Sequence, residues 1–201
     1  MNLTLSNYSI QPEILRQLPG PVVIVGAAHS GKSELSHTAL SPDLRTAVIG
    51  TGPIAEPELA ARIAHLKAQR PPQWQVYEGA ESLIAEVRRA VSAGHAQVLI
   101  DSLSQWIGAA IVGSTKRYSL EQVRTLVEHE IDELITYIQS APPARIVIVT
   151  SEAGAGVTPA AVAPRLFREL LGKCNSRVAA ACPTVVLVSC GLPLVLKTSQ
   201  N

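Results

Sequence analysis

The stretch GAAHSGKS, at residues 26–33, follows the apolar run VVIV at residues 22–25. A glycine, four residues and then Gly-Lys-Ser is the spacing of a phosphate-binding loop, in which successive backbone N–H groups converge on phosphate oxygens. Such a loop needs a strand before it and a helix after it, because the start of the helix adds its positive end to the anion site. We therefore expect the chain to bind a nucleotide or another polyphosphate through Gly26, Ala27, Ala28, His29, Ser30, Gly31, Lys32 and Ser33.

The same site needs a positive charge and oxygen ligands for Mg²⁺. Lys32 supplies a charge at the outer phosphates, and the Ser33 hydroxyl is the usual metal ligand of such loops. A carboxylate at the end of a neighbouring strand completes the metal site, and Asp101 follows the apolar residues 98–100. The alternative is that the Asp101 carboxylate only caps a loop and binds no metal. Glu152 ends another strand, where ligands of open α/β sheets gather, and its alternative is an ordinary loop carboxylate.

Composition limits the class of protein. The chain has 201 residues, of which 47% are hydrophobic, 16% charged and only 3% aromatic, and its net charge is +1. This size and this aliphatic excess favour one domain built on a buried parallel sheet. With a net charge this close to zero, the chain has no long-range electric field that favours binding of nucleic acid or an acidic membrane. Cys174, Cys182 and Cys190 form neither a zinc pattern nor an even disulfide set, so we expect all three to be small buried side chains.

Alternating strands and helices predict a three-layer α/β fold with a mostly parallel sheet. We expect an extension at residues 1–20 and a single catalytic domain at 21–201. The short turn at residues 191–193 predicts an antiparallel hairpin at the C-terminal edge. We expect strands at 22–25, 46–49, 75–77, 98–100, 146–149, 185–188 and 194–196, and helices at 31–40, 57–69, 82–93, 119–139 and 158–181, the last bent near Pro164.

One uncharged stretch, residues 178–196, is long enough to be tested as a membrane span. Pro183, Gly191 and Pro193 interrupt it, so a helix end and two short strands explain it better. The N-terminus lacks a basic start with a long apolar segment. We expect no membrane span and a cytoplasmic protein.

A polar stripe lies on the expected helix at 57–69. Glu58, Arg62, His65 and Gln69 are separated by four, three and four residues, which places them on one helix face. A solvated polar face explains this spacing. The same spacing also allows a neutral imidazole to attack an α-phosphate and form a covalent nucleotidyl intermediate. Helix geometry alone does not choose between the two.

Several segments in this order resemble the bifunctional adenosylcobinamide kinase / adenosylcobinamide-phosphate guanylyltransferase family. They are GAAHSGKS at 26–33, ELAARIAHLKAQRP at 58–71, QW and VYE within 73–78, VLIDSLSQWI at 98–107, IVTSEAGAGVTP at 148–159, RLFRELLGKCNSRVAAA at 165–181 and GLPLVLK at 191–197. The resemblance extends over nearly the whole chain after the extension. RIAH followed by RP, then SEAGAGVTP and FRELLGKCN, is far more specific than the phosphate loop alone.

The resemblance implies a RecA-like P-loop fold, a homotrimer and two reactions. In the first, ATP or GTP phosphorylates the aminopropanol hydroxyl of adenosylcobinamide. In the second, a histidine that falls on His65 takes GMP from GTP, and the substrate phosphate then accepts it to give adenosylcobinamide-GDP. The resemblance also implies catalytic roles for Lys32 and Asp101 with Mg²⁺. The resemblance also adds Glu58, Arg62, Glu152 and Arg168 to the residues that we expect to bind the nucleotide.

This sequence departs from the family pattern at several positions. In the phosphate loop Ala27 replaces a glycine, so a positive φ at that position would hinder the loop, and His29 replaces an arginine. Leu66 stands where a second histidine is common, and Ser151 and Ser176 replace Asn and Gln. Two alternatives therefore stay open: a P-loop kinase or transferase with one activity, and a nucleotide-binding protein without catalysis.

Overall fold

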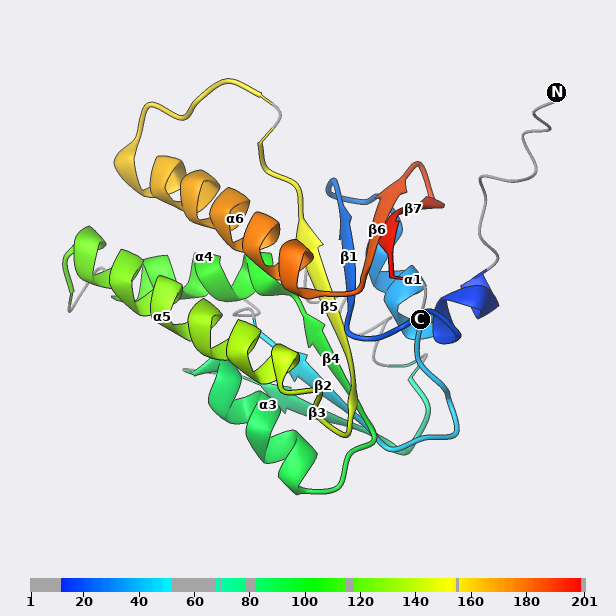
Figure 1. Ribbon diagram of the computed structural model, residues 1–201. Helices are drawn as coiled ribbons and strands as arrows, with labels where there is room; N and C mark the ends of the chain where they lie inside the picture. The colour runs from blue at the N-terminus through cyan, green and yellow to red at the C-terminus, as the bar shows by residue number, and fades with distance from the viewer. Residues whose placement is uncertain are drawn as a thin grey trace, which may run out of the picture.

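The computed structural model describes residues 12–51, 68, 70–78, 82–114, 118–154 and 156–199. Within them a seven-stranded sheet is surrounded by helices (Figure 1). The strands are β1 (Val22–Gly26), β2 (Thr46–Gly50), β3 (Trp74–Glu78), β4 (Gln97–Asp101), β5 (Arg145–Ser151), β6 (Thr184–Ser189) and β7 (Leu192–Thr198). The helices are η2 (Pro12–Arg16), α1 (Lys32–Thr38), α3 (Leu83–Ser92), α4 (Leu103–Ser114), α5 (Leu120–Gln139) and α6 (Val162–Ala181).

The strand order is β3-β2-β4-β5-β1-β6-β7. All neighbouring strands are parallel except β6 and β7, which form an antiparallel hairpin. The predicted α/β P-loop architecture with its antiparallel C-terminal edge is therefore confirmed. Strand β1 lies between β5 and β6, and β5 separates it from β4. Because the carboxyl ends of parallel strands share one edge, the chain leaves β1, β2, β4 and β5 at the same edge of the sheet.

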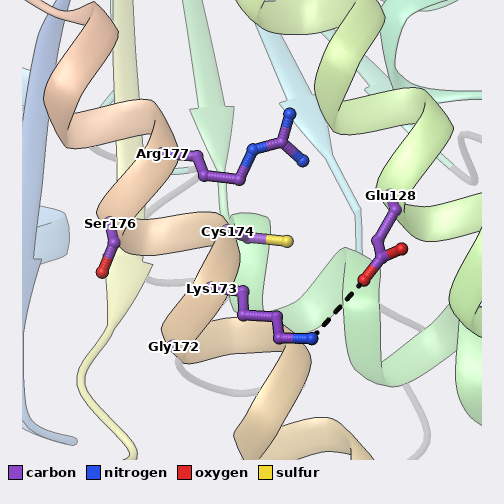
Figure 2. A pocket seen from close by; sticks show the side chains of 6 residues that line it. All are labelled: Glu128, Gly172, Lys173, Cys174, Ser176 and Arg177. Carbon is purple, nitrogen blue, oxygen red and sulfur yellow. Dashed lines mark ion pairs between the residues drawn. The ribbon is translucent and has the colours of Figure 1, made fainter.

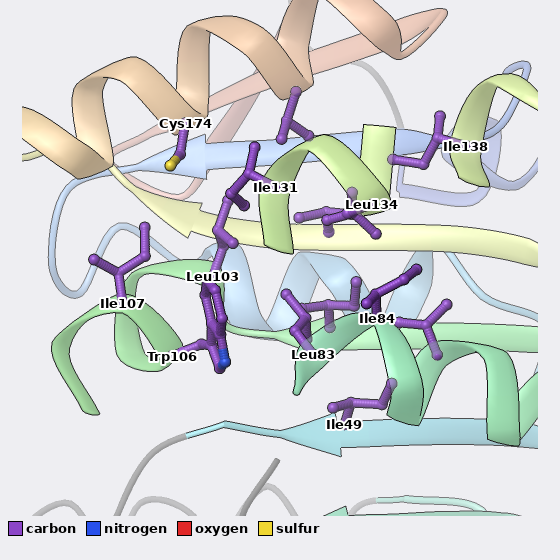
Figure 3. Packing of buried hydrophobic residues seen from close by; sticks show 14 of the residues in the cluster. Ile49, Leu83, Ile84, Leu103, Trp106, Ile107, Ile131, Leu134, Ile138 and Cys174 are labelled. Atoms are coloured by element: carbon purple, nitrogen blue, oxygen red, sulfur yellow. The ribbon is translucent and has the colours of Figure 1, made fainter. Parts of the chain in front are cut away.

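Each face of the sheet has its own hydrophobic core. Helices α3, α4, α5 and α6 cover one face, whereas α1 and η2 cover the other (Figure 1). Alternate residues of β1 enter different cores: Val23 belongs to the core on the α3–α6 side, while Val22 and Ile24 belong to the core on the α1 side. Figure 3 shows the larger core, which includes Leu103 and Trp106 of α4 together with Ile131 and Leu134 of α5. The strands are buried on both faces, which explains their continuous apolar sequences.

Two helices differ from the sequence prediction. Helix α4 was not predicted, because its sequence LSQWIGAAIVGS lacks a polar face and it is packed against β5, α5 and α6. Helix α6 begins at Val162 rather than near residue 158, so Pro164 lies in its first turn and does not bend it. A missing proline N–H costs nothing in the first turn, since that N–H has no partner inside the helix. Of the helix predicted at 57–69, only residue 68 is described, and it is helical.

Helix α5 agrees closely with its prediction. Ser119 and Gln122 form a complete capping box at its start. Of the apolar residues at helical spacing in α5, Leu120 is partly buried and Leu126 is 45% exposed. The others are buried: Val123, Val127, Ile131, Leu134 and Ile138. The prediction of three buried cysteines holds for Cys174 and Cys182 and is wrong for Cys190, which lies exposed at the tip of the β6–β7 hairpin.

The segment before β1 is packed onto the domain. Leu15 of η2 is fully buried. The Arg145 guanidinium donates hydrogen bonds to the carbonyl oxygens of Leu15 at 2.7 Å, Leu18 at 2.9 Å and Ala39 at 3.2 Å. One side chain of β5 thus fastens η2 and the end of α1 to the sheet. Among the described helices, none has the length and apolar character that crossing a membrane requires.

Candidate active site

The phosphate loop connects β1 to α1 in the predicted position. Strand β1 ends at Gly26 and α1 begins at Lys32. The left-handed backbone conformation falls on His29, with φ 58°, and on Gly31, with φ 94°, and not on Ala27. The alanine that replaces the family glycine is therefore accommodated without strain. The unusual position is His29, because a side chain other than glycine rarely adopts this conformation.

Two close approaches fix the shape of this loop. A Cβ atom added to Gly26 would lie 2.5 Å from the carbonyl oxygen of Val188 and 2.6 Å from Ser30 Oγ. On the other side the N–H of Gly191, in the β6–β7 turn, donates to the carbonyl oxygen of Ser30 at 3.0 Å. The hairpin predicted from residues 191–193 thus supports the phosphate loop directly.

Three polar side chains of the loop, Ser30, Lys32 and Ser33, are buried, whereas His29 is exposed. Lys32 and Ser33 are each only 7% exposed. Lys32 Nζ donates to the carbonyl oxygen of Ala27 at 2.9 Å, so its ammonium is held over the loop. Ser30 Oγ is buried and has no hydrogen-bond partner in the described structure. An unsatisfied buried hydroxyl is costly, so this oxygen is suited to a partner that is a ligand.

Asp101 ends β4 at the same edge of the sheet. It is paired in register with Gly50 of β2 and with Val149 of β5. Ser102 follows and caps α4: its Oγ accepts from Gln105 N at 3.3 Å, and its carbonyl oxygen accepts from Trp106 N at 3.0 Å. The predicted carboxylate therefore lies between a strand end and the positive end of a helix.

Glu152 follows β5 and is directly connected to the phosphate loop. Its N–H donates to the carbonyl oxygen of Gly26 at 3.1 Å, while its side chain is exposed. The preceding Ser151 is paired with Gly26 and accepts a hydrogen bond from Ser104 Oγ at 3.1 Å. The loop of β1 and the exits of β4 and β5 are thus brought together.

Arg168 lies in α6 and holds the loop that follows β5. Its Nη1 donates to the carbonyl oxygen of Gly156 at 2.9 Å, and its Nη2 donates to that of Gly154. This loop is otherwise open, since Val157 is 96% exposed and a Cβ at either glycine would meet nothing within 4 Å. The expected contact of Arg168 with nucleotide stays a prediction.

Glu58, Arg62 and His65 lie outside the described residues, as does Gln69. The chain enters that segment directly after Thr51, which follows β2 at the carboxyl edge of the sheet. The starting point of the segment is therefore on the side of the phosphate loop.

The oxygen donors at this edge suit a hard divalent cation. Ser33 supplies a hydroxyl and Asp101 a carboxylate, and oxygen ligands are what Mg²⁺ prefers. Among the described residues no group of three or more His, Cys, Asp or Glu side chains is arranged to hold a metal.

Sequence reasoning did not identify Thr51 and Ser102. The Thr51 hydroxyl donates to the carbonyl oxygen of Ser102 at 2.6 Å and accepts from its N–H at 3.0 Å. The motif Ser102-x-x-Gln105 has the spacing of a capping box, which would have announced both Ser102 and helix α4. The contact with Thr51 depends on strand register and leaves no local signal.

A pocket of about 430 Å³ lies elsewhere, between α5 and α6 (Figure 2). Its lining includes Glu128, Lys173, Cys174 and Arg177. Lys173 pairs with Glu128 at 3.8 Å and with Glu169 at 3.1 Å, and Arg177 pairs with Asp132. These charges bind the two helices to each other, so we assign no ligand to this pocket.

Comparisons with known proteins agree with this geometry. The sequence profile described as "Cobinamide kinase / cobinamide phosphate guanyltransferase" matches residues 22–196. The bifunctional adenosylcobalamin biosynthesis protein CobU of Escherichia coli (strain K12) is 28% identical over 181 residues, which cover 88% of this chain and 99% of that protein. The bifunctional protein CobP of Pseudomonas aeruginosa is 30% identical over 176 residues, covering 87% and 96%.

Among solved structures, a protein from Pyrococcus horikoshii OT3 superposes with a TM-score of 0.54 at 10% identity, covering 96% of this chain and 94% of that one. This likeness concerns the fold alone. The profile match is of another kind, because it includes the phosphate loop, the strand end at Asp101 and the hairpin that supports the loop. The chain belongs to the cobinamide kinase / cobinamide phosphate guanyltransferase family.

Proposed function

We propose that this chain carries both activities of its family. It phosphorylates adenosylcobinamide with ATP or GTP and then transfers GMP from GTP to the product, through a covalent adduct on His65. The observation that supports this most strongly is the phosphate loop, with buried Lys32 and Ser33, together with Asp101 at the exit of β4 on the same edge of the sheet. A profile match over residues 22–196 supports the choice of substrate class.

In the kinase step the loop N–H groups and Lys32 bind the phosphates of the nucleotide. The Lys32 ammonium exchanges its bond to the Ala27 carbonyl for phosphate oxygens, and Ser30 Oγ donates to the same anion. The substrate hydroxyl attacks the γ-phosphorus and releases its proton to water, the bond to the β-phosphate oxygen breaks, and the nucleoside diphosphate leaves. Mg²⁺, held by Ser33 and Asp101, supplies charge neutralisation on the phosphates when bound.

In the transferase step a ring nitrogen of neutral His65 attacks the α-phosphorus of GTP. The bond from this phosphorus to the bridging oxygen breaks, pyrophosphate leaves, and a phosphoramidate to GMP forms. An oxygen of the phosphorylated corrinoid then attacks the same phosphorus, the P–N bond breaks, and the imidazole is regenerated. Arg62 and the helix start at Lys32 stabilise the phosphate charge in both displacements.

Separate labels distinguish the two activities. With γ-labelled GTP, both the wild type and His65→Ala are expected to transfer label to adenosylcobinamide, while only the wild type forms the GDP conjugate. Lys32→Met is expected to lose both reactions. His129→Ala, which removes an exposed histidine of α5, is the matched control and keeps both. Phosphorylation without any conjugate in the wild type would support the single-activity kinase, and nucleotide binding without turnover would support the non-catalytic protein.

We further propose that the protein works as a cytoplasmic homotrimer, as the family resemblance implies. Light scattering of the purified full chain tests the assembly. A monomer that retains full activity would contradict it.

A further inference from the structure

We propose that Thr51 is a positioning residue for Asp101, the carboxylate assigned to the metal-phosphate centre. The inference rests on the proposed function only for the role of Asp101. Thr51 touches neither substrate nor metal in this account. It acts through the backbone of Ser102, the residue that follows Asp101.

The Thr51 hydroxyl makes two hydrogen bonds to one residue. It donates to the carbonyl oxygen of Ser102 at 2.6 Å and accepts from the N–H of Ser102 at 3.0 Å. Thr51 is 4% exposed and Ser102 is 5% exposed, so both bonds lie in a buried environment. Gly50 and Asp101 are the last paired residues of β2 and β4, so the threonine continues the contact where the strand ladder ends.

Helix α5 also begins with a Ser-x-x-Gln sequence, and its cap shows which local hydrogen bond Thr51 replaces at the start of α4. At the start of α5, Ser119 accepts from Gln122 N and the Gln122 side chain accepts from Ser119 N, which completes a local capping box. At the start of α4, Ser102 Oγ accepts from Gln105 N, but the N–H of Ser102 donates to Thr51. The cap of α4 is thus closed by a neighbouring strand, and this contact fixes the exit of β4 as well as the helix.

The contact extends toward the phosphate loop through a series of hydroxyl groups. Ser102 Oγ lies 3.0 Å from Ser104 Oγ, which donates to Ser151 Oγ at 3.1 Å. Ser151 is paired with Gly26, the first residue of the loop. The chain of contacts therefore fixes the end of β4, where Asp101 lies, relative to the end of β5 and the start of the phosphate loop.

Loss of the Thr51 hydroxyl leaves the buried Ser102 N–H without its partner. The backbone at the exit of β4 then relaxes, and the Asp101 carboxylate moves with it. A displacement of about 1 Å at a catalytic group costs up to roughly a hundredfold in rate. Binding of the nucleotide base and outer phosphates does not depend on this contact, so the KM for GTP is expected to stay nearly constant.

The test uses the full-length protein with three variants. Thr51→Val keeps the shape and removes both hydrogen bonds, Thr51→Ser restores the hydroxyl, and Ser119→Ala removes a helix cap remote from the site. The first readout is the affinity of the GDP complex for Mn²⁺, measured by electron paramagnetic resonance. The second is the split between kcat and KM in the kinase reaction, and thermal unfolding reports the general cost of a lost cap.

For Thr51→Val we expect Mn²⁺ affinity to fall about tenfold, which corresponds to about 1.4 kcal/mol. We expect kcat to fall roughly ten- to a hundredfold with KM for GTP changed less than about twofold. Thr51→Ser is expected to recover most of both losses. Ser119→Ala is expected to unfold at a lower temperature with unchanged Mn²⁺ affinity and kcat.

A folded Thr51→Val protein with wild-type Mn²⁺ affinity would overturn the inference, and so would a Thr51→Ser protein no better than Thr51→Val. If Thr51→Val does not accumulate, Ser104→Ala interrupts the same series of hydroxyls, and unchanged Mn²⁺ affinity there would overturn it equally. Asp101→Asn must weaken Mn²⁺ binding, because otherwise Thr51 has no ligand to position. A wild type that binds Mn²⁺ in a Thr51-dependent way but performs neither reaction would refute the proposed function alone.

Discussion

Replacing Gly26 by alanine tests the tight construction of the phosphate loop. The new Cβ would lie 2.5 Å from the Val188 carbonyl oxygen and 2.6 Å from Ser30 Oγ. Val188 is paired with Gly26 in the sheet, so its oxygen cannot retreat without opening the contact between β1 and β6. Overpacking of this kind costs about 1–3 kcal/mol of stability. The alternative, outward movement of the loop, displaces the N–H groups that bind phosphate.

The assay is equilibrium binding of a fluorescent GTP analogue together with urea unfolding. Nucleotide affinity is expected to fall by roughly ten- to a hundredfold, as expected when binding groups are displaced by about 1 Å. Gly172→Ala is the matched control, because Gly172 is exposed within α6 and an added Cβ meets nothing within 4 Å. This control is expected to gain about 0.5–1 kcal/mol, since glycine is a poor residue in a helix interior. A Gly26→Ala protein with wild-type affinity and stability would refute the close-approach argument.

Three further predictions concern stability and reactivity. Arg145→Gln removes the donors to the carbonyl oxygens of Leu15, Leu18 and Ala39, and it should lower the free energy of unfolding in urea by about 2–3 kcal/mol. Arg145→Lys should recover little of this loss, because an ammonium lacks the fork of donors of a guanidinium. A loss below about 0.5 kcal/mol for Arg145→Gln would contradict this prediction. Burial raises the pKa of Cys174 and of Cys182 to about 12, whereas Cys190 is exposed, so a thiol reagent at pH 8 should label one cysteine in the native protein and three after unfolding. Fast labelling of a second native thiol would show that the core is more open than described. Burial, helped by Arg70 and opposed by Glu34, lowers the pKa of His37 to about 4. In the unfolded chain the His37 imidazole binds a proton near pH 6.5. The contribution of neutral His37 to the free energy of unfolding is therefore fully present above pH 6.5, and up to about 3 kcal/mol of it is lost as the pH falls toward 4. His37→Phe, which keeps an aromatic ring against Trp74, should flatten that part of the pH profile, and His129→Ala should not; identical profiles for His37→Phe and wild type would remove His37 as the cause.

Features coded by neighbouring residues could be predicted from the sequence. The GAAHSGKS spacing predicted the loop between β1 and α1, and Ser119 with Gln122 predicted the start of α5. The continuous apolar runs predicted the buried strands, and the short turn at residues 191–193 predicted the antiparallel hairpin. In each case a few adjacent residues determine the backbone, so no long-range contact was needed.

Features that depend on register and packing could not be predicted. The body of helix α4 packs against β5, α5 and α6 and has no polar face to give a helical period, so only the capping-box spacing of Ser102 and Gln105 marks its start in the sequence. Leu126 fits the apolar spacing of α5 but is 45% exposed, which depends on the packing around the helix and not on its own sequence. The contact between Thr51 and Ser102 exists only because β2 and β4 are paired with Gly50 opposite Asp101. The carbonyl contacts of Arg168 likewise depend on how the loop after β5 returns to α6.

The most direct test of the account is covalent guanylylation of the protein itself. The full chain is incubated with α-labelled GTP and Mg²⁺, and the labelled protein is then treated with acid or with alkali. We expect one label per chain that is lost in acid, kept in alkali, displaced by cobinamide phosphate, and absent from His65→Ala but present in His129→Ala. A wild-type protein that binds GTP and acquires no label, or a label that remains on His65→Ala, would contradict it.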